Sequence, residues 1–578
     1  MKKILLILLI VTLGVGAFVF FVSQTPPEVI SRSVTRVVSR VVPTVVPYGE
    51  EFLGDVAKFL PYSDEILGVN EKQRHLILFQ NNNELRPDGG FISAYGVLEI
   101  DDGDVSLDFA DVYTLLNDVE QPVAPLPFYV FLNDPGFKGF YFHDANFDPD
   151  FETSVQDLEK LYWLQTGKKV ERFDSVVAVN FEFLEDIVGI YDLEVSGVTL
   201  TAENLFTVLE HEVKNIDTHN VEALANRKNV LGELANKLIK ESILSYEKYK
   251  ELFAVVNKGL DEKKILLYLR NPEMQQLAAD EGWTGEFDPA SYENYIHTSI
   301  ANIGGRKSDR YVKKNHEYFV VFDGDKRGRV RYTLSLGHYG GYNLNSDVYK
   351  AYVRTFIPKG SVFLSSQGSF YQNRHNYIKD GYFESYLVLN PGKTTQVTIE
   401  YLLPKGITQD NFELDVIKQS GTRDVWEMMV QYSSDNSFKA ENFDVRDNVG
   451  FWTGFLSKDK HFDFEYVQDS LPPLVVWQRF ADHNVIEVNF SETINGPIAL
   501  DPSHYEVVDL NYIDDVTEVI DVTDVYFKNG NMYLVTTGIS KVEEERYNLR
   551  LINLEDEAGN KTSPSVLEVT VVKRAKEF

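Results

Sequence analysis

The chain has 578 residues, of which 43% are hydrophobic and 13% aromatic, so it carries enough apolar side chains for several domain cores. Its formal net charge of −32 excludes the electrostatic footprint of a nucleic-acid-binding protein and suits divalent cations, basic partners or simple solubility. The chain contains no cysteine, which excludes disulfides, thiolate metal sites and a thiol nucleophile.

The first segment predicts a membrane anchor. Lys2 and Lys3 precede Ile4–Val22, an uncharged run in which Thr12 is the only polar side chain, and this run is long enough to span a bilayer as a helix. No small-residue cleavage site follows it, so we expect residues 1–23 to remain as a signal anchor.

The charges that flank this run disagree about its orientation. Lys2 and Lys3 favour an inside amino terminus, whereas the opposite orientation is favoured by Arg32, Arg36 and Arg40. The export-like opening and the absence of cysteine lead us to expect a single-pass protein of the cell membrane with the bulk of the chain outside the cytoplasm.

Residues 24–61 are predicted to form a stalk. They are interrupted by Pro26, Pro27, Pro43 and Pro47. Valines between the prolines recur at helical spacing, but β-branched residues weaken a helix. Both an amphipathic juxtamembrane helix and an extended spacer fit this pattern.

Residues 62–305 alternate strand and helix signals and predict an α/β domain with a mixed sheet and a helical insertion. The strand signals cover 75–79, 91–100, 105–109, 175–179, 190–195 and 264–269. The helix signals cover 153–165, a segment opening at 201, 220–242, 244–259 and 273–281. Thr153 is the expected N-cap of the first of these helices.

Beyond this domain the pattern changes to short strands separated by turn residues. Residues 306–468 predict a β-sandwich, and the Pro-Pro pair in 469–473 predicts a linker. Residues 469–578 predict a second sandwich of immunoglobulin-like type, with Trp477 and Phe490 as core candidates. The predicted fold class is therefore multidomain: a transmembrane helix, an α/β domain and two β-sandwiches.

One long motif carries a family resemblance. Gln80–Ile92, with the sequence QNNNELRPDGGFI, resembles the signature of the uncharacterised bacterial envelope family of unknown function numbered four thousand and twelve. The resemblance continues in 143–151, 174–179, 200–204 and 418–422, and so extends over roughly 70–430. The family brings no established activity.

Two further resemblances imply different functions. Phe173–Val195 is similar in shape to part of the LytR–CpsA–Psr type of wall-polymer transferase, which implies a lipid diphosphate held by several arginines and a divalent cation. Between 62 and 304 this chain offers only Arg74, Arg86, Arg172, Arg227 and Arg270. The segments 485–492 and 553–560 resemble the immunoglobulin-like repeat of S-layer proteins, which implies a spacer or adhesion module.

The long motif supplies the first candidate site. Polar residues follow an apolar strand and paired glycines precede the next strand, so a ligand or another chain segment could approach the backbone there. The candidate ligand-binding residues are Asn81, Asn83, Glu84, Arg86, Asp88, Gly89 and Gly90. The alternative is a structural turn in which asparagines cap the backbone and Arg86 forms an internal ion pair.

A second candidate site follows from alternating oxygen-bearing residues. The candidate metal ligands are Asp144, Asn146, Asp148 and Asp150. Pro149 and Val155 occupy the positions where an EF-hand requires glycine and glutamate, so the segment is not an EF-hand. The alternative is a helix-entry loop whose acidic residues favour the dipole of the following helix.

The sequence thus favours a non-enzymatic surface protein that functions in envelope organisation or adhesion, with the membrane and a cell-wall or surface polymer as partners. The alternative is a divergent wall-polymer transferase that acts on a lipid-linked diphosphate. No nucleotide, hydrolase or zinc motif occurs, and a divalent cation is the only cofactor that the residues suggest.

Overall fold

The structure is a computed structural model. It describes residues 54–572, with gaps at 67, 70, 102–103, 116–139, 168–171, 191–193, 196–197, 209–245, 324–326, 369–380, 434–435, 447, 469–471, 510–518, 538, 540–545, 557–558 and 563–565. The predicted anchor, most of the predicted stalk and the predicted helix at 220–242 lie outside the described residues. Within the described residues, no helix combines the length and the apolar character that crossing a bilayer requires.

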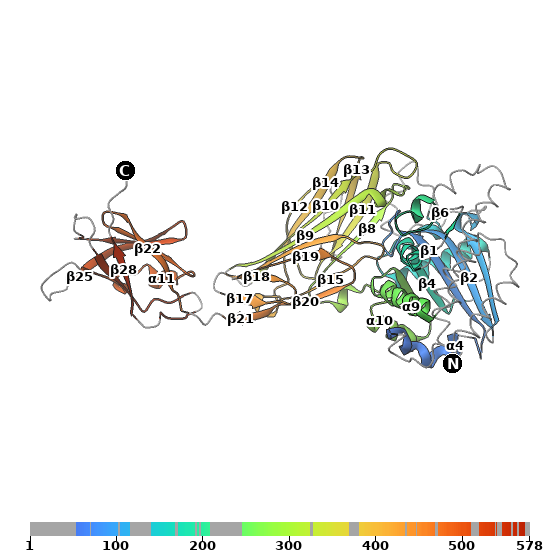
Figure 1. Cartoon of the computed structure of the whole chain (residues 1–578), viewed down its shortest axis with the longest axis horizontal. Helices are drawn as coiled ribbons and strands as arrows, with labels where there is room; N and C mark the ends of the chain where they lie inside the picture. The colour runs from blue at the N-terminus through green and yellow to red at the C-terminus, as the bar shows by residue number, and fades with distance from the viewer. Residues whose placement is uncertain are drawn as a thin grey trace.

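A five-stranded mixed sheet forms the centre of the α/β unit, in the order β3-β2-β1-β4-β7 (Figure 1). Its strands are β1 (Gln73–Asn81), β2 (Phe91–Asp101), β3 (Asp104–Asp111), β4 (Ser175–Asn180) and β7 (Ile265–Leu269). Only β1 and β4 run parallel, and the other neighbours are antiparallel. The central residues of β1 and all residues of β4 are buried, as expected for strands that are covered on both faces.

Helices of the α/β unit pack against this sheet. They are α5 (Phe151–Thr166), α6 (Phe181–Val188), α9 (Tyr246–Asp261) and α10 (Pro272–Asp280). Helix α5 begins two residues before the predicted start, because the Asp150 carboxylate rather than Thr153 caps it. Of the strand predicted at 190–195, Ile190 lies in a turn and Glu194–Val195 form β5, which pairs with β6 (Val198–Thr199).

The last residues of the predicted stalk pack on the α/β unit. Gly54–Tyr62 form the 3-10 helix η2, which leads into α4 (Ser63–Ile66). Phe59 is buried and its ring stacks on Trp283 with a centroid distance of 6.0 Å. Sequence periodicity missed this contact because the partner ring lies more than 200 residues away.

Two facing sheets form the β-sandwich, one in the order β12-β14-β10-β9-β16-β19-β18 and one in the order β13-β11-β8-β15-β20. Strands β17 and β21 pair separately. The bounds are β8 (Tyr295–Asn302), β9 (Val312–Asp323), β10 (Arg327–His338), β11 (Tyr349–Phe356), β12 (Val362–Gln367), β13 (Tyr382–Leu389), β14 (Thr394–Leu402), β15 (Glu413–Ile417), β16 (Val425–Gln431), β17 (Asn436–Lys439), β18 (Asp444–Arg446), β19 (Val449–Phe455), β20 (Lys460–Asp463) and β21 (Glu465–Gln468).

The α/β unit and the sandwich share their cores. Strand β8 precedes the predicted boundary at 305/306, yet it pairs with β11 and β15 of the sandwich. Ala301 and Tyr352 from sandwich strands lie in the apolar cluster of the α/β unit, and Leu85 from the α/β unit lies in the cluster of the sandwich. The two units therefore bury apolar surface against each other, and a change at their contact affects both.

The C-terminal sandwich has a core of its own, and Figure 1 draws it as a separate body. Its strands follow the order β22-β23-β26-β25-β24-β27-β28. The bounds are β22 (Val475–Asp482), β23 (Val485–Phe490), β24 (Tyr505–Asp509), β25 (Val519–Lys528), β26 (Asn531–Thr536), β27 (Arg546–Ile552) and β28 (Val566–Val572). Phe490 packs against this core as predicted, but Trp477 lies on an edge strand with its ring under Arg479 and is not in the core.

The fold class is confirmed at the level of a mostly β, multidomain protein with a mixed sheet in the α/β unit and several sandwich-like sheets. The hairpin predicted at 101–104 is present, since Asp101 pairs with Asp104. The immunoglobulin-like type of the last sandwich stays a prediction.

Candidate functional site

The long motif forms a turn that closes on itself. After β1, the Asn81 side-chain oxygen accepts hydrogen bonds from the backbone and side-chain nitrogens of Asn83, both at 3.1 Å. The Asn81 carbonyl accepts from Glu84 N at 3.0 Å, and Glu84 O accepts from Phe91 N at 2.8 Å. The asparagines therefore cap backbone groups, which is the arrangement that stabilises a turn.

Arg86 points into the protein. It is 4% exposed, and its guanidinium donates to the carbonyls of Leu85 and Asn302. Its Nη2 atom lies 3.3 Å from a Glu84 carboxylate oxygen and 3.9 Å from an Asp144 carboxylate oxygen. The one basic side chain of the motif is thus engaged by internal acceptors, one of them on sandwich strand β8.

The glycines of the motif admit another chain segment. At Gly89 a Cβ atom would lie 2.1 Å from the Gln80 side-chain oxygen, and at Gly90 it would lie 2.4 Å from the Asn81 backbone. Gly421 has φ of +74°, and a Cβ atom there would lie 2.0 Å from Gly89 O. The close approach is therefore between two loops of the same chain.

The second loop in this contact is 418–422, the last stretch of the family resemblance. The Gln419 side chain donates to Arg86 O at 2.9 Å and Ile300 O at 2.8 Å, and it accepts from Ile300 N at 2.8 Å. Ser420 donates to Lys263 O at 2.6 Å, next to β7. This loop binds the α/β unit to the sandwich.

The predicted metal residues lie in the third segment at this contact, but they do not share one role. Asn146 donates from Nδ2 to Gly90 O at 2.6 Å, and Asp144 lies beside Arg86. Asp150 caps α5 by accepting from Thr153 N at 3.0 Å and also accepts from Phe287 N at 3.2 Å. Asp148 accepts from Asp150 N at 3.0 Å.

The structure therefore brings together the two sites that the sequence treated as separate. We call the contact of residues 81–90, 143–150 and 418–422 the junction. Burial raises the pKa of Asp88 in the junction to about 7 and also raises the pKa of Asp148. Burial raises the pKa of Glu84 too, although the positive charge of Arg86 acts against that shift.

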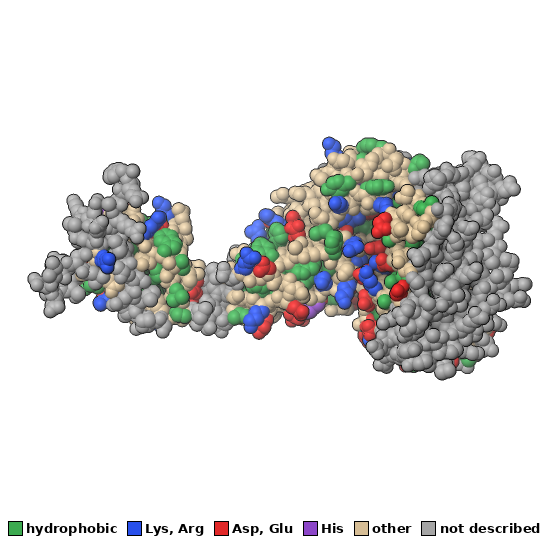
Figure 2. Space-filling model, viewed as in Figure 1, with side chains coloured by type: hydrophobic (Ala, Val, Ile, Leu, Met, Phe, Trp, Pro, Cys, Tyr) green, Lys and Arg blue, Asp and Glu red, His purple; other side chains and the backbone are tan. Residues whose placement is uncertain are grey.

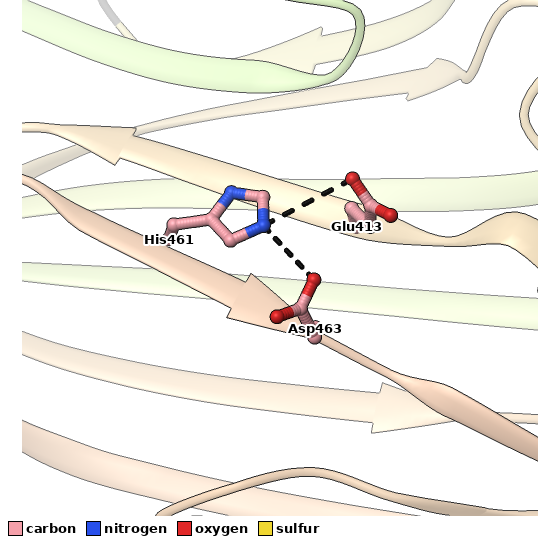
Figure 3. Close-up of side chains that lie close together, drawn as sticks. All are labelled: Glu413, His461 and Asp463. Carbon is pink, nitrogen blue, oxygen red and sulfur yellow. Dashed lines mark hydrogen bonds and ion pairs between the residues drawn. The ribbon is translucent and has the colours of Figure 1, made fainter.

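A different cluster, which the sequence did not reveal, lies on paired strands of the sandwich. Glu413 of β15 is opposite Asp463 of β20, and Asp415 is opposite His461. His461 Nε2 lies 2.9 Å from an Asp463 oxygen and 3.9 Å from a Glu413 oxygen, and Figure 3 shows this atom directed between the two carboxylates. The i, i+2 spacing of His461 and Asp463 on a strand was the only signal available.

This cluster is exposed and has an ordinary electrostatic explanation. His461 Nδ1 lies 2.8 Å from an Asp415 oxygen, and the hydrogen bond to Asp415 raises the pKa of His461. A protonated imidazole among three carboxylates satisfies the geometry as an ion pair. One ligand atom from each of Glu413, His461 and Asp463 lies within 4.8 Å of the other two, which is close enough to coordinate a metal ion.

Comparison with known proteins supports the family resemblance for part of the chain. Residues 70–213 match the model of a family described as a protein of unknown function, DUF4012. That match includes the 81–90 and 143–150 segments of the junction and ends before 418–422. No curated protein is similar enough in sequence to be a relative.

Solved structures with local likeness include the N-terminal part of the bacterial S-layer protein SbsC, with 14% identity, a TM-score of 0.16 and coverage of 18% of this chain and 24% of that one. A putative nutrient-binding protein of Legionella pneumophila has 8% identity, a TM-score of 0.21 and coverage of 30% and 73%. An M1 zinc metallopeptidase of Deinococcus radiodurans has 10% identity, a TM-score of 0.17 and coverage of 32% and 47%. The chain thus spans about a quarter of the SbsC fragment, and TM-scores this low carry no argument about fold or function.

Proposed function

We propose that the protein is a non-enzymatic, single-pass membrane-anchored cell-surface protein in which the α/β unit and both sandwiches are displayed outward for envelope organisation or adhesion. The observation that carries this proposal is the burial of Arg86. A guanidinium that holds together Leu85, Asn302 and two carboxylates is a structural group, and it leaves no cation at the motif for a ligand.

The alternative, a divergent wall-polymer transferase, needs several free cationic donors around a diphosphate. Arg74 lies 3.1 Å from Glu99, and Arg270 pairs with Glu159. Arg310 lies just beyond the α/β unit in sequence and pairs with Glu185 at 3.5 Å. On the face seen in Figure 2, basic side chains are interspersed with acidic ones, which suits solubility better than retention of a polyanion.

A partner of the surface-polymer class needs exposed groups, and one loop offers them. Tyr339 and Tyr342, between β10 and β11, are each 68% exposed, and the neighbouring Leu344 is 67% exposed. Exposed aromatic rings supply flat apolar area together with a hydroxyl group, which suits a polysaccharide. This loop is our candidate contact for the wall polymer.

Two experiments test the proposal. Protease added to intact spheroplasts that express the full chain should remove the carboxyl-terminal region while a cytoplasmic marker stays intact; protection of that region would contradict the outward display. Purified full-length protein should also sediment with isolated cell-wall polymer and transfer no labelled lipid-linked polymer.

The polymer contact has a matched control within the chain. Replacement of Tyr339 and Tyr342 by Ala should abolish co-sedimentation, whereas Phe451→Ala, which removes a ring that is 51% exposed on β19, should leave it unchanged. Equal sedimentation of both variants would exclude this loop as the contact. Transfer of the labelled polymer at a rate that depends on enzyme concentration would instead establish the transferase.

A further inference from the structure

The exposed cluster on β15 and β20 places like charges against each other. In these antiparallel strands Glu413 lies opposite Asp463, and Asp415 lies opposite His461. The residue between the two members on each strand is buried, so the alternation of side chains places all four on the outer face of the sheet. Like charges directly opposite each other destabilise a strand pair, so this arrangement calls for a cation between them.

The surroundings of the cluster supply too little positive charge. Within the described residues, His461 is the only basic side chain that has a nitrogen within 4.0 Å of any of the three carboxylates. The adjacent Lys460 lies over the ring of Trp452 instead, 5.5 Å from its centroid. A protonated imidazole neutralises one of the three negative charges and leaves two, whereas a divalent ion compensates two of them.

A hydrogen bond fixes which nitrogen of His461 faces the carboxylates as an acceptor. The Nδ1 atom lies 2.8 Å from an Asp415 carboxylate oxygen. An ionised carboxylate only accepts hydrogen bonds, so Nδ1 carries the hydrogen and, in the neutral ring, Nε2 carries the lone pair. Figure 3 shows Nε2 directed between the carboxylates of Glu413 and Asp463. A lone pair that faces two anions is repelled by them, so either a proton or a metal ion belongs at this point.

Asp415 has the position of the group that orients a metal-binding histidine. A ligating imidazole almost always donates its other N–H to a carboxylate, a carbonyl or water, which holds the ring in place and raises its basicity. The Asp415 side chain is 26% exposed, whereas those of Glu413 and Asp463 are 64% and 76% exposed. The more buried carboxylate thus holds the ring, and the two exposed carboxylates flank its other nitrogen.

The spacing of the three ligand atoms fits an ion of the Zn²⁺ type. Such an ion holds nitrogen and oxygen ligands at about 2.0–2.2 Å in a tetrahedron, so the ligand atoms lie roughly 3.3 Å apart. His461 Nε2 lies 2.9 Å from an Asp463 oxygen and 3.9 Å from a Glu413 oxygen. Rotation of the exposed carboxylates can close this difference without moving a strand. An imidazole nitrogen in the set favours this type of ion over Ca²⁺, which takes oxygen ligands.

We propose that Glu413, His461 and Asp463 bind a divalent metal ion of the Zn²⁺ type, with Asp415 as the positioning residue that holds the imidazole. None of these residues belongs to the segment 144–150, in which the sequence predicts the metal ligands. Strand β20 has four residues and forms the edge of its sheet, next to β15. The ion would join this short edge strand to β15 and leave its remaining coordination position to water.

The test measures Zn²⁺ binding by the full-length chain in detergent after treatment with a chelator. Equilibrium dialysis should find one bound ion fewer per chain in His461→Gln than in the wild type, and Asp463→Asn should show the same loss. Asp444→Asn is the matched control, because this carboxylate is 63% exposed but lies beside Arg446, outside the cluster. It should leave the number of bound ions unchanged.

The positioning role of Asp415 has a separate readout. Asp415→Ala should weaken Zn²⁺ binding about 10–100-fold, because the imidazole loses the group that orients it. Asp415→Asn keeps an oxygen that can accept from Nδ1, so it should recover most of the affinity. Zn²⁺ should also raise the melting temperature of the first sandwich by several degrees in the wild type and not in His461→Gln.

Three results would overturn the proposal. The first is a wild-type chain that binds no Zn²⁺, a measurement that needs no variant. The second is the same number of bound ions in the wild type and in either His461→Gln or Asp463→Asn, whichever of these two exposed-site variants is folded. The third is displacement of the bound Zn²⁺ by an equal concentration of Ca²⁺, which would indicate a site made of oxygen ligands alone.

Discussion

The junction keeps Arg86, Asp88 and Asn146 in the interior, whereas the C-terminal sandwich fills its interior mainly with apolar side chains such as Leu534 and Leu549 from its own strands. The polar groups of the junction come from three segments far apart in sequence, and both 143–150 and 418–422 donate hydrogen bonds to the backbone of the turn 81–90. The C-terminal core comes from about one hundred consecutive residues. The comparison teaches that a polar contact of this kind couples two units, while a local apolar core makes a unit independent.

The largest expected effect is at the junction. Arg86→Ala would leave Glu84 and the Asn302 carbonyl without their buried partner and should lower the free energy of unfolding by about 3–5 kcal/mol. Calorimetry should show this loss in the transition of the α/β unit and first sandwich and not in that of the C-terminal sandwich. Arg446→Ala is the control, because its pair with Asp444 is exposed and should matter little. If the melting transition of Arg86→Ala is unchanged, Arg86 is not a structural group and the motif is again a candidate ligand site.

The reciprocal change is Leu549→Ala. Leu549 is fully buried in the C-terminal core, so the cavity should cost about 2–5 kcal/mol in the transition of that sandwich alone. An equal loss of stability in the transition of the α/β unit would show that the two bodies unfold together, and would contradict the independence of the C-terminal sandwich.

Gly421→Ala sharpens the comparison within the junction. The new Cβ atom would lie 2.0 Å from Gly89 O at a φ of +74°, so we expect a loss of about 2 kcal/mol or more. Gly392→Ala is matched to it, since Gly392 has the same φ of +74° and open space around it. Because both variants share the same backbone strain, the difference between their denaturant midpoints reports the stability cost of the steric contact between Gly421 and Gly89. Equal midpoints would mean that the close approach of the two loops is not needed for stability.

The exposed cluster on β15 and β20 should give a smaller, pH-dependent effect. The hydrogen bond to Asp415 raises the pKa of His461 above its ordinary value of 6.5. Its stabilisation is therefore fully present below pH 6.5 and is lost as the pH rises through the folded-state pKa. Because His461 is about half exposed, we expect the free energy of unfolding in EDTA to fall by less than about 1 kcal/mol between pH 5.5 and pH 8.5. In the His461→Gln variant this pH-dependent difference should be absent. If the pH-dependent difference in stability persists in His461→Gln, other titratable groups cause it.

No change at all is expected when the C-terminal sandwich is separated. A fragment of residues 470–573 should fold cooperatively and melt within about 1 °C of the corresponding transition of the full chain. Asp556 already caps the turn by accepting from Asn560 N at 2.8 Å, so calcium and a chelator should give the same melting temperature. A calcium-induced rise of several degrees would make this sandwich a cation-stabilised module.

Much of the fold was predictable because its signals are local. The helix near 153–165, the strand at 175–179 and the hairpin at 101–104 follow from hydrophobic period, capping residues and turn residues. The assignment of β8 to the sandwich was not predictable, because a buried strand has the same pattern in either sheet. Trp477 was misjudged for a related reason, since a large apolar side chain on an edge strand can lie outside the core.

The candidate sites show the same limit. The sequence picked out the turn 81–90 and the loop 144–150, and for the turn it posed the alternatives of ligand binding and an internal ion pair. It could not place Asp144 against Arg86 or Asn146 against Gly90, because side-chain partners more than 50 residues apart leave no periodic trace. The cluster at His461 escaped notice because its members pair across two strands whose register only the folded sheet defines.

By itself the sequence determined the acidic charge, the absence of thiol chemistry, many of the strands and helices, and the match of residues 70–213 to a family model of unknown function. Only the tertiary structure decided that three motif segments form one buried junction, that Arg86 is bound internally and that one oxygen of the buried Asp88 carboxyl has no hydrogen-bond partner among the described residues. The reason is physical: composition, period and capping act over a few residues, whereas burial and charge compensation depend on groups that the folded chain brings from distant positions.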